Sequence, residues 1–284
     1  MQDIFHTVVD YSKQSYVQKI SISLRPDGFS FVIQSVDTDD LLAVFHTKIE
    51  ESLEIQKYVG ALQSFFKHDL LQQTFQKITI IYVTPKITII PSSLFSEHTV
   101  ALLYEANHVR LPSEAILQYK LKHTEGYLLY AVPQTIIDEC YASFGTHIQI
   151  LPQAAPFLES SCIQNKLMVQ KNVFVSLEQT FFDIAVVEGQ KIILYNTFEY
   201  SNNNDYMYYV LHVFEQLRLH PMEQQLLLSG IISKASHYFE SACMFIKNVS
   251  IVEPPQSHKG FMQYPFNQSL YPLFCNVCNV SLCE

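Results

Sequence analysis

Glycine is scarce in this chain, with seven glycines in 284 residues, and tryptophan is absent. A phosphate cradle needs glycine, because glycine combines positive φ angles with close approach of the backbone to the phosphate. Three of the seven, Gly28, Gly126 and Gly189, are best explained as turn residues. Gly60 lies in a predicted helix, so only Gly230 is well placed for a nucleotide. We therefore predict that an ordinary phosphate-binding loop is missing.

Basic residues and long apolar runs are also few. The chain has 18 lysines and arginines against 27 acidic residues, a net charge of -9. Nucleic-acid binding depends on clustered basic side chains, so this balance argues against it. No apolar run approaches the ~20 residues that span a bilayer, and the first 16 residues lack the apolar core of a signal peptide. We expect a soluble, cytoplasmic protein without a transmembrane segment.

The cysteines do not form a complete zinc motif. Three of them lie in the C-terminal tail and could supply three ligands, whereas a structural zinc site needs four. His258 is a fourth candidate, but the spacing does not demand it. We interpret these thiols as free and predict no metal site. The six cysteines are Cys140, Cys162, Cys243, Cys275, Cys278 and Cys283.

The clearest pattern in the chain runs from residue 173 to residue 217. Residues 173–177, 182–187 and 192–196 are short apolar or alternating runs, and Glu188 and Gly189 form a tight-turn signal, which predicts strands joined by hairpins. An apolar stripe at helical spacing follows the polar loop 201–204. Asn204 is the predicted N-cap of this helix.

A second copy of this pattern lies near the N-terminus. Residues 20–24 (ISISL) match residues 173–177 (VFVSL), and residues 44–47 (VFHT) match residues 194–197 (LYNT). An apolar helical face then runs through residues 55–70. We interpret the chain as a duplicated βββα unit, although two unrelated meanders would share the same hairpin pattern. The predicted parts are a first half (residues 1–165), a second half (166–252) and an irregular tail (253–284) that packs on the body.

Two such units, each continuing into αβ segments, resemble the duplicated ribonuclease H-like fold of the actin, Hsp70 and sugar-kinase superfamily. Residues 127–133 (YLLYAVP) are followed by a helix, a strand at 148–150, a second helix and the strand at 173–177. This order is similar to the type IV pilus accessory branch, and residues 226–230 (LLLSG) resemble the element that touches adenosine. The chain looks even more like a bacterial family with an actin-like ATPase fold and no assigned activity. The resemblance implies an α/β protein in which each half is a mixed sheet with flanking helices.

The departures from that superfamily concern the nucleotide site. The superfamily places an aspartate at the end of each first strand, to hold magnesium or water, with a glycine nearby. Here those positions are Ser23 and Ser176, and neither following turn has the acid-x-glycine pattern. In the loop 201–205 (SNNND), only Asp205 fits the usual Gly-Gly-acid sequence. We predict a degenerate cleft, whose candidate residues are Ser23, Arg25, Ser176, Glu178, Gln179, Asn202, Asn203, Asp205, Ser229 and Gly230.

Two further expectations concern charged residues near this cleft. Arg25 and Glu178 follow the two first strands, so we expect them to meet as a salt bridge that fills an empty nucleotide site. A ribonuclease H-type nuclease needs several carboxylates on two metals. Asp27 and Asp183 are available, but we attribute both to solvated hairpins.

These observations predict a non-catalytic, bacterial, actin-like scaffold or interaction protein with an unknown protein partner, no catalytic residues and no expected cofactor. One alternative is a divergent protein that binds ATP and magnesium through neutral contacts from Ser176, Gln179, Asn202, Asn203 and Gly230. Another is a small-molecule kinase of the same fold, with Asp205 or Asp183 as its acid.

Overall fold

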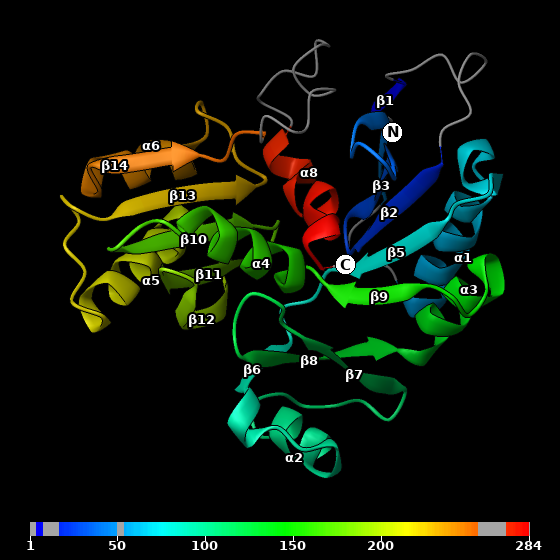
Figure 1. Cartoon of the computed structure of the whole chain (residues 1–284), viewed down its shortest axis with the longest axis horizontal. Helices are drawn as coiled ribbons and strands as arrows, with labels where there is room; N and C mark the ends of the chain where they lie inside the picture. Colours follow the sequence, from blue (N-terminus) through cyan, green and yellow to red (C-terminus); the bar gives the residue numbers. More distant parts are fainter. Residues whose placement is uncertain (1–3, 8–16, 50–53, 255–270, 284) are drawn as a thin grey trace.

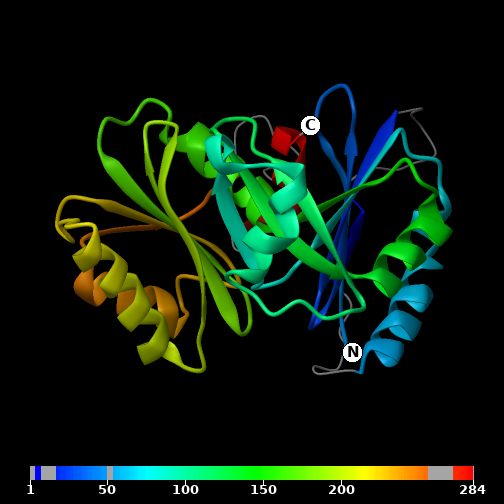
Figure 2. The ribbon, with the colours of Figure 1, turned by 90° about the horizontal axis from the view of Figure 1, so that it is seen from below.

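Two sheets lie side by side in the computed structural model, which describes residues 4–7, 17–49, 54–254 and 271–283 (Figure 1). Each sheet carries two helices on its outer face, and Figure 2 shows these helices at opposite ends of the molecule. A third, smaller sheet and two buried helices lie between and below the two main sheets. None of the helices in the described segments is long and apolar enough to cross a membrane.

The first sheet has the strand order β1-β4-β3-β2-β5-β9. Strands β2, β3 and β4 form an antiparallel meander, and β5 then pairs with β2 in parallel. Helices α1 and α3 cover its outer face. The elements are β1 (Ile4–Thr7), β2 (Gln18–Arg25), β3 (Gly28–Ser35), β4 (Leu41–Lys48), α1 (Ile55–Phe66), η1 (Asp69–Gln72), β5 (Lys77–Tyr82), α3 (Gln134–Phe144) and β9 (Gln149–Pro152).

The second sheet repeats this arrangement, in the order β12-β11-β10-β13-β14. Strands β10, β11 and β12 form an antiparallel meander, and β13 pairs with β10 in parallel. The elements are β10 (Lys171–Leu177), β11 (Phe181–Glu188), β12 (Lys191–Glu199), α5 (Asn203–Gln216), β13 (Gln225–Gly230), α6 (His237–Phe245) and β14 (Asn248–Ile251). The predicted duplication and the ribonuclease H-like fold class are confirmed.

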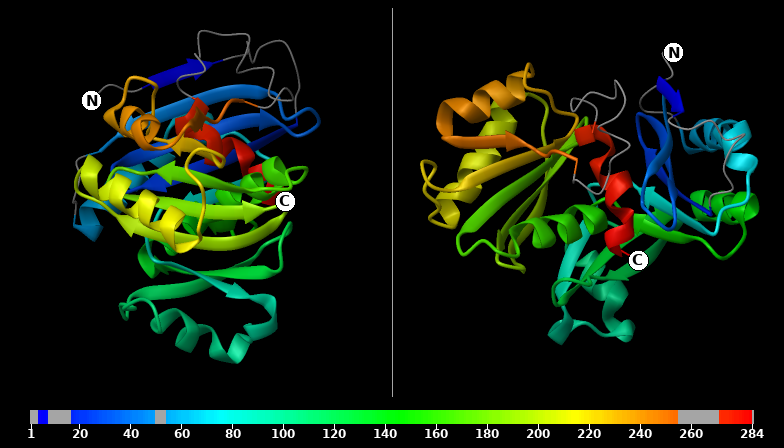
Figure 3. Two further views of the ribbon diagram at one scale, coloured as in Figure 1. Left: turned by 90° about the vertical axis from the view of Figure 1, so that its left-hand side faces the viewer. Right: turned by 45° about the horizontal axis from the view of Figure 1, so that its top comes forward.

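The third sheet, in the order β6-β8-β7, is an insertion in the first half and carries the short helix α2. Helices α4 and α8 lie between the two main sheets (Figure 3). Because α4 is surrounded by protein, it is buried on nearly every face, which accounts for its lack of an amphipathic pattern. The elements are β6 (Ile87–Pro91), η2 (Ser92–Leu94), η3 (Glu97–Thr99), α2 (Val100–Glu105), β7 (Glu114–Lys120), β8 (Gly126–Pro133), α4 (Ala154–Asn165), α8 (Tyr271–Cys278) and η4 (Asn279–Cys283).

The tail differs from the prediction. We expected residues 253–284 to be irregular, yet they contain α8 and η4. Tyr271 and Phe274 are buried in this helix, as predicted for aromatic residues that pack the tail on the body. The other aromatic residues expected to do so lie outside the described residues. The proline, glutamine, asparagine and serine content of the tail suggested loop, whereas the helix is stabilised by tertiary burial, which a composition argument does not capture.

Candidate functional site

The candidate site is built where the first strand of each half ends. Strand β2 ends at Arg25 and strand β10 at Leu177. Ser23 lies opposite Ser30 and Ile81, and Ser176 lies opposite Asp183 and Ser229. Both serines are buried inside their sheets. The two positions where the superfamily has an aspartate are therefore occupied by small, buried hydroxyl groups.

Arg25 and Glu178 meet between the halves. The Nη2 atom of Arg25 is 2.5 Å from Oε2 of Glu178, and both residues are about 95% buried, with exposed fractions of 5% and 4%. Arg25 Nε also donates to Oδ1 of Asp27 at 3.1 Å. Tyr200 fixes the other side of the turn by donating to the carbonyl of Glu178 at 2.6 Å. The predicted salt bridge is confirmed, and it joins the equivalent strand ends of the two halves.

Burial and charge act against each other in this pair. Burial raises the pKa of Glu178 to about 7, although Arg25 opposes the shift. Burial alone lowers the pKa of Arg25, but Glu178 and Asp27 outweigh it and leave that pKa raised. The guanidinium therefore stays charged, while burial makes the Glu178 carboxylate easier to protonate than an exposed one.

Asp183 is not a solvated hairpin residue, as we had predicted, but is fully buried on β11. Its Oδ1 accepts from Tyr195 at 2.8 Å and from Thr197 at 2.7 Å, and its Oδ2 accepts from Gln153 at 3.1 Å. Burial raises the pKa of Asp183 to about 6, and these three donors limit the rise. Alternating residues along β11 suggested that one face of this strand meets solvent. The prediction failed because α4 packs on that face, and the sequence of β11 gives no sign of α4.

Gln153 was missed by the sequence reasoning, although it connects the two halves. Its amide nitrogen donates to Asp183 and, at 2.8 Å, to the carbonyl of Thr84. Its Oε1 accepts from the backbone nitrogen of Thr84 at 3.0 Å. A buried glutamine next to Pro152 has no sequence signal, because its partners lie far away in the chain.

The polar loop before α5 caps the helix and contacts α6. Asn202, and not Asn204, is the N-cap: its Oδ1 accepts from the backbone nitrogens of Asn204 and Asp205. Asp205 in turn accepts from the nitrogen of Ser201 at 3.0 Å. Asn203 donates to Ser241 on α6 at 2.5 Å. The first turn of α5 is therefore satisfied within the loop.

Gly230 is required by the sheet. It has a φ angle of +83°, and a Cβ atom there would lie 2.0 Å from the carbonyl oxygen of Leu177. Ser229 donates its hydroxyl to the carbonyl of Val175 at 3.2 Å. The glycine that looked suited to a nucleotide thus allows β13 to approach β10.

A pocket of about 250 Å³ remains beside the ion pair. It is smaller than the roughly 300–1,000 Å³ of typical ligand sites. Asp27 and Glu178 place carboxylates in its wall, together with the exposed Gln179. Helix α8 contacts the end of β10, where Asn276 donates to the hydroxyl of the buried Ser176 at 3.3 Å. No sequence signal pointed to this helix.

Magnesium-bound ATP, which the fold family implies, does not fit these residues. The positions expected to hold the metal are buried serines, and the space near the phosphates contains a buried ion pair. Carboxylates in the pocket wall repel phosphate. Across the residues that the structure describes, no group of three or more His, Cys, Asp or Glu side chains is arranged to bind a metal.

Known proteins share this architecture. A family model described as "Protein of unknown function (DUF3822)" matches residues 10–249. A solved structure from Bacteroides thetaiotaomicron, a protein with actin-like ATPase fold and unknown function, is 26% identical, with a TM-score of 0.77 over 86% of this chain and 93% of that one. A chain of the PilM–PilN type IV pilus biogenesis complex is 14% identical, with a TM-score of 0.60 over 95% of this chain and 100% of that one. A search of the curated proteins finds no match. Both predicted resemblances are confirmed: the chain has the actin-like ATPase fold.

Proposed function

We propose, from the premise that this chain belongs to the DUF3822 family of proteins of unknown function, that it is a non-catalytic actin-like scaffold. In this proposal the cleft that binds nucleotide in other proteins of the fold is closed by the chain's own side chains. The protein then acts by presenting its surface to another protein, and not by turning over a substrate.

The ion pair between Arg25 and Glu178 is the observation that carries the proposal. Arg25 is the last residue of β2 and Glu178 directly follows β10, and the two side chains meet at 2.5 Å in a buried position. Separating them to admit a phosphate would leave the buried Glu178 carboxylate without its ion-pair partner, which costs about 3–5 kcal/mol. The phosphate would also have to displace the Glu178 carboxylate from the guanidinium.

The scaffold role is supported by the fold's use in an assembly. A protein with this architecture is a component of the PilM–PilN type IV pilus biogenesis complex. That likeness is one of fold alone, so it suggests complex formation as a role and says nothing of the partner.

Calorimetric titration tests the closed cleft. ATP and ADP, each with magnesium, are titrated into the full chain, with thermal unfolding measured at 1 mM ligand. We expect no heat of binding and no change in the unfolding temperature. A site with a Kd of about 10 μM would stabilise the fold by about 2.7 kcal/mol at that concentration, so the null result is easy to distinguish.

Saturable binding of ATP in the micromolar range would overturn the proposal and favour the divergent ATP-binding protein. Release of phosphate from ATP would overturn it further, in favour of an enzyme. The Arg25→Ala variant provides a second measurement, because it opens the ion pair: binding that appears only in this variant would show that the pair itself excludes the nucleotide.

A further inference from the structure

The outer end of the second half is the end of its sheet that lies away from the cleft. Because β10, β13 and β14 are parallel, all three begin at this end, on the left in Figure 1 and toward the viewer in the left view of Figure 3. Asn165 at the end of α4 donates to the carbonyl of Gly189 at 3.2 Å, and the backbone nitrogen of Lys247 donates to the carbonyl of Pro221 at 3.0 Å. The outer end is therefore formed by the segments 166–171, 188–191, 215–224 and 244–247.

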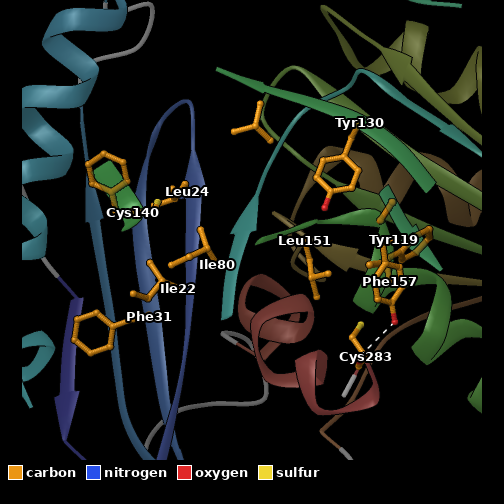
Figure 4. Packing of buried hydrophobic residues seen from close by; sticks show 14 of the residues in the cluster. Ile22, Leu24, Phe31, Ile80, Tyr119, Tyr130, Cys140, Leu151, Phe157 and Cys283 are labelled. Carbon is orange, nitrogen blue, oxygen red and sulfur yellow. Dashed lines mark hydrogen bonds between the residues drawn. The ribbon is translucent and has the colours of Figure 1, made fainter. Parts of the chain in front are cut away.

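Apolar side chains are exposed at this end. Leu167 and Val169 are 90% and 92% exposed, and Met168 between them is 47% exposed. Leu24 and Ile80, by contrast, are enclosed in the core, as Figure 4 shows. Single exposed apolar residues are ordinary on a protein surface, but three in succession with others nearby indicate contact with a second apolar surface. The other exposed apolar side chains at this end are Met222, Met244 and Phe245.

Basic side chains gather at the same end, in a chain whose net charge is -9. The second half (residues 166–252) has six lysine and arginine residues, and five of them lie here. The acidic residues at this end are three, so the local charge is positive although the chain is acidic. The five basic residues are Lys166, Lys171, Lys191, Arg218 and Lys247, and the three acidic ones are Glu188, Glu215 and Glu223.

This combination fits a lipid bilayer better than a protein partner. Lysine is depleted in protein–protein interfaces, whereas four lysines surround the exposed apolar side chains here. Long basic side chains cover apolar surface while their charged ends reach anionic headgroups. Cations near helix C-termini, such as Lys166 and Arg218, also counter the helix dipole. That effect explains neither Lys191, which lies in a hairpin, nor the exposed Leu167 and Val169.

We propose that the outer end of the second half is a docking surface for a bilayer with anionic headgroups. Leu167 and Val169 enter the apolar boundary of the bilayer, and the surrounding basic side chains bind the lipid phosphates. Because β10 runs from Lys171 at this end to Leu177 at the cleft, the docked protein keeps its cleft and first half directed away from the bilayer. The inference goes beyond the proposed function and does not depend on a closed cleft.

Vesicle flotation of the full chain tests this surface. Vesicles of phosphatidylcholine alone are compared with vesicles of phosphatidylcholine and phosphatidylglycerol in equal amounts. We expect binding to the anionic vesicles only, and weaker binding as salt is added, because salt screens exposed charges. Absence of binding to anionic vesicles at low salt would overturn the proposal. Equal binding to both kinds of vesicle would also overturn it, because the basic residues would then have no part.

Two matched double variants locate the binding surface. Leu167→Asp with Val169→Asp should weaken vesicle binding by roughly tenfold or more, because each aliphatic side chain loses its burial in the bilayer. Leu102→Asp with Val109→Asp is the control, since these residues are 70% and 80% exposed in the third-sheet insertion and the change in charge is the same. The control should bind as the parent chain does. An equal loss in both double variants would overturn the proposal.

The absence of tryptophan from the chain provides a direct measurement of insertion. Val169→Trp introduces a single indole, whose fluorescence should shift to shorter wavelength with anionic vesicles as the ring leaves water. Val109→Trp is the control and should keep its emission. A shift in the control, or none in Val169→Trp, would overturn the proposal, as would a protein partner that binds residues 167–169 while vesicles do not. Failure here is distinct from failure of the proposed function, because nucleotide binding is measured without vesicles.

Discussion

The two halves of this protein are copies of one unit that have diverged in opposite directions at the same point. The first half has Ser-Leu-Arg at the end of its first strand, and the second half has Ser-Leu-Glu. Arg25 and Glu178 therefore occupy equivalent places and carry opposite charges, and they bind each other. Duplication first produces two identical surfaces that face each other, and a pair of opposite charges makes those surfaces complementary. The comparison shows that two equivalent positions of the repeated unit have become partners of each other.

The surroundings of the two copies also differ. The first half has one additional strand, β1, at one edge of its sheet and carries the third sheet as an insertion. On the second half, β12 forms one edge of the sheet in the described part of the chain. Both copies use a glycine for close packing of the backbone, at Gly28 and Gly230, although these lie at different points of the unit. The following predictions test how far the two copies remain equivalent, beginning with the largest effect.

Gly230→Ala should destabilise the second half by about 3 kcal/mol or more, because the added Cβ meets the Leu177 backbone and the φ angle is positive. Gly28→Ala should also destabilise the first half, since its Cβ would lie 2.2 Å from the carbonyl oxygen of Thr47. Urea unfolding measures both. Gly60→Ala is the control: no atom lies within 4 Å of its Cβ, so the helix should gain about 0.5–1 kcal/mol. A normal unfolding midpoint for Gly230→Ala would contradict the close approach of β13 and β10.

The ion pair should behave as a coupled unit. Arg25→Ala and Glu178→Ala should each lower the free energy of unfolding by about 3–5 kcal/mol at pH 8, because each removes the partner of a buried charge. The double variant should cost clearly less than the sum of the two, as measured by a double-mutant cycle. At pH 5, below the pKa of about 7 of Glu178, the coupling should shrink. Additive costs at pH 8 would mean that the two copies are not coupled here.

Replacement of both charged residues by apolar residues tests how much the ion pair contributes to the stability of the fold. Arg25→Met with Glu178→Leu should be close to wild type in stability or exceed it, because buried ion pairs add little net stability. Such a result would show that the ion pair adds little to the free energy of unfolding. Its role would then lie in the alignment of the two halves and in the exclusion of anions from the cleft.

Asp183 has no counterpart in the first half, where Ser30 stands opposite Ser23. Its pKa is raised from an ordinary value of 3.8 to about 6, so the native state binds a proton more tightly than the unfolded chain. The resulting stability is complete below pH about 4 and is lost as pH rises through about 6, in total on the order of 2–3 kcal/mol.

Asp183→Asn should remove this pH dependence while keeping the shape of the side chain, as read from unfolding midpoints between pH 4 and 7. Thr197→Val removes a donor that favours the carboxylate, and so should raise the pKa of Asp183 further. The pH range of the stability loss should then move upward. A profile for Asp183→Asn that matches the wild type would assign the pH dependence to other groups.

The helices that follow the two meanders should differ in a small way. Asn202 caps α5 with its side chain, whereas Glu54 at the start of α1 makes no such bond. Asn202→Ala should lower the free energy of unfolding by about 1 kcal/mol, and Glu54→Ala should lower it little. Thermal unfolding measures both, and equal costs would mean that the cap of α5 contributes nothing particular to the second half.

Much of the architecture was accessible from residues close together in the chain. The two meanders follow from alternation and turn glycines, and the duplication follows from the repeated order of those patterns. The ion pair was accessible because Arg25 and Glu178 follow equivalent strands, so a duplicated fold brings them together. Asp183, Gln153 and the cap of α5 were misjudged or missed, because their surroundings come from distant segments and loop geometry.

The sequence by itself determined the repeated unit, the loss of acids and glycines from the expected phosphate loops, and the two opposite charges at equivalent places. Only the tertiary structure decided what packs between the two sheets. Helix α8 comes from a tail whose composition suggested loop, and Gly230 allows β13 to approach the backbone of Leu177 closely. The physical reason is that local patterns report which face of an element is apolar, whereas burial between two halves depends on which distant surfaces meet.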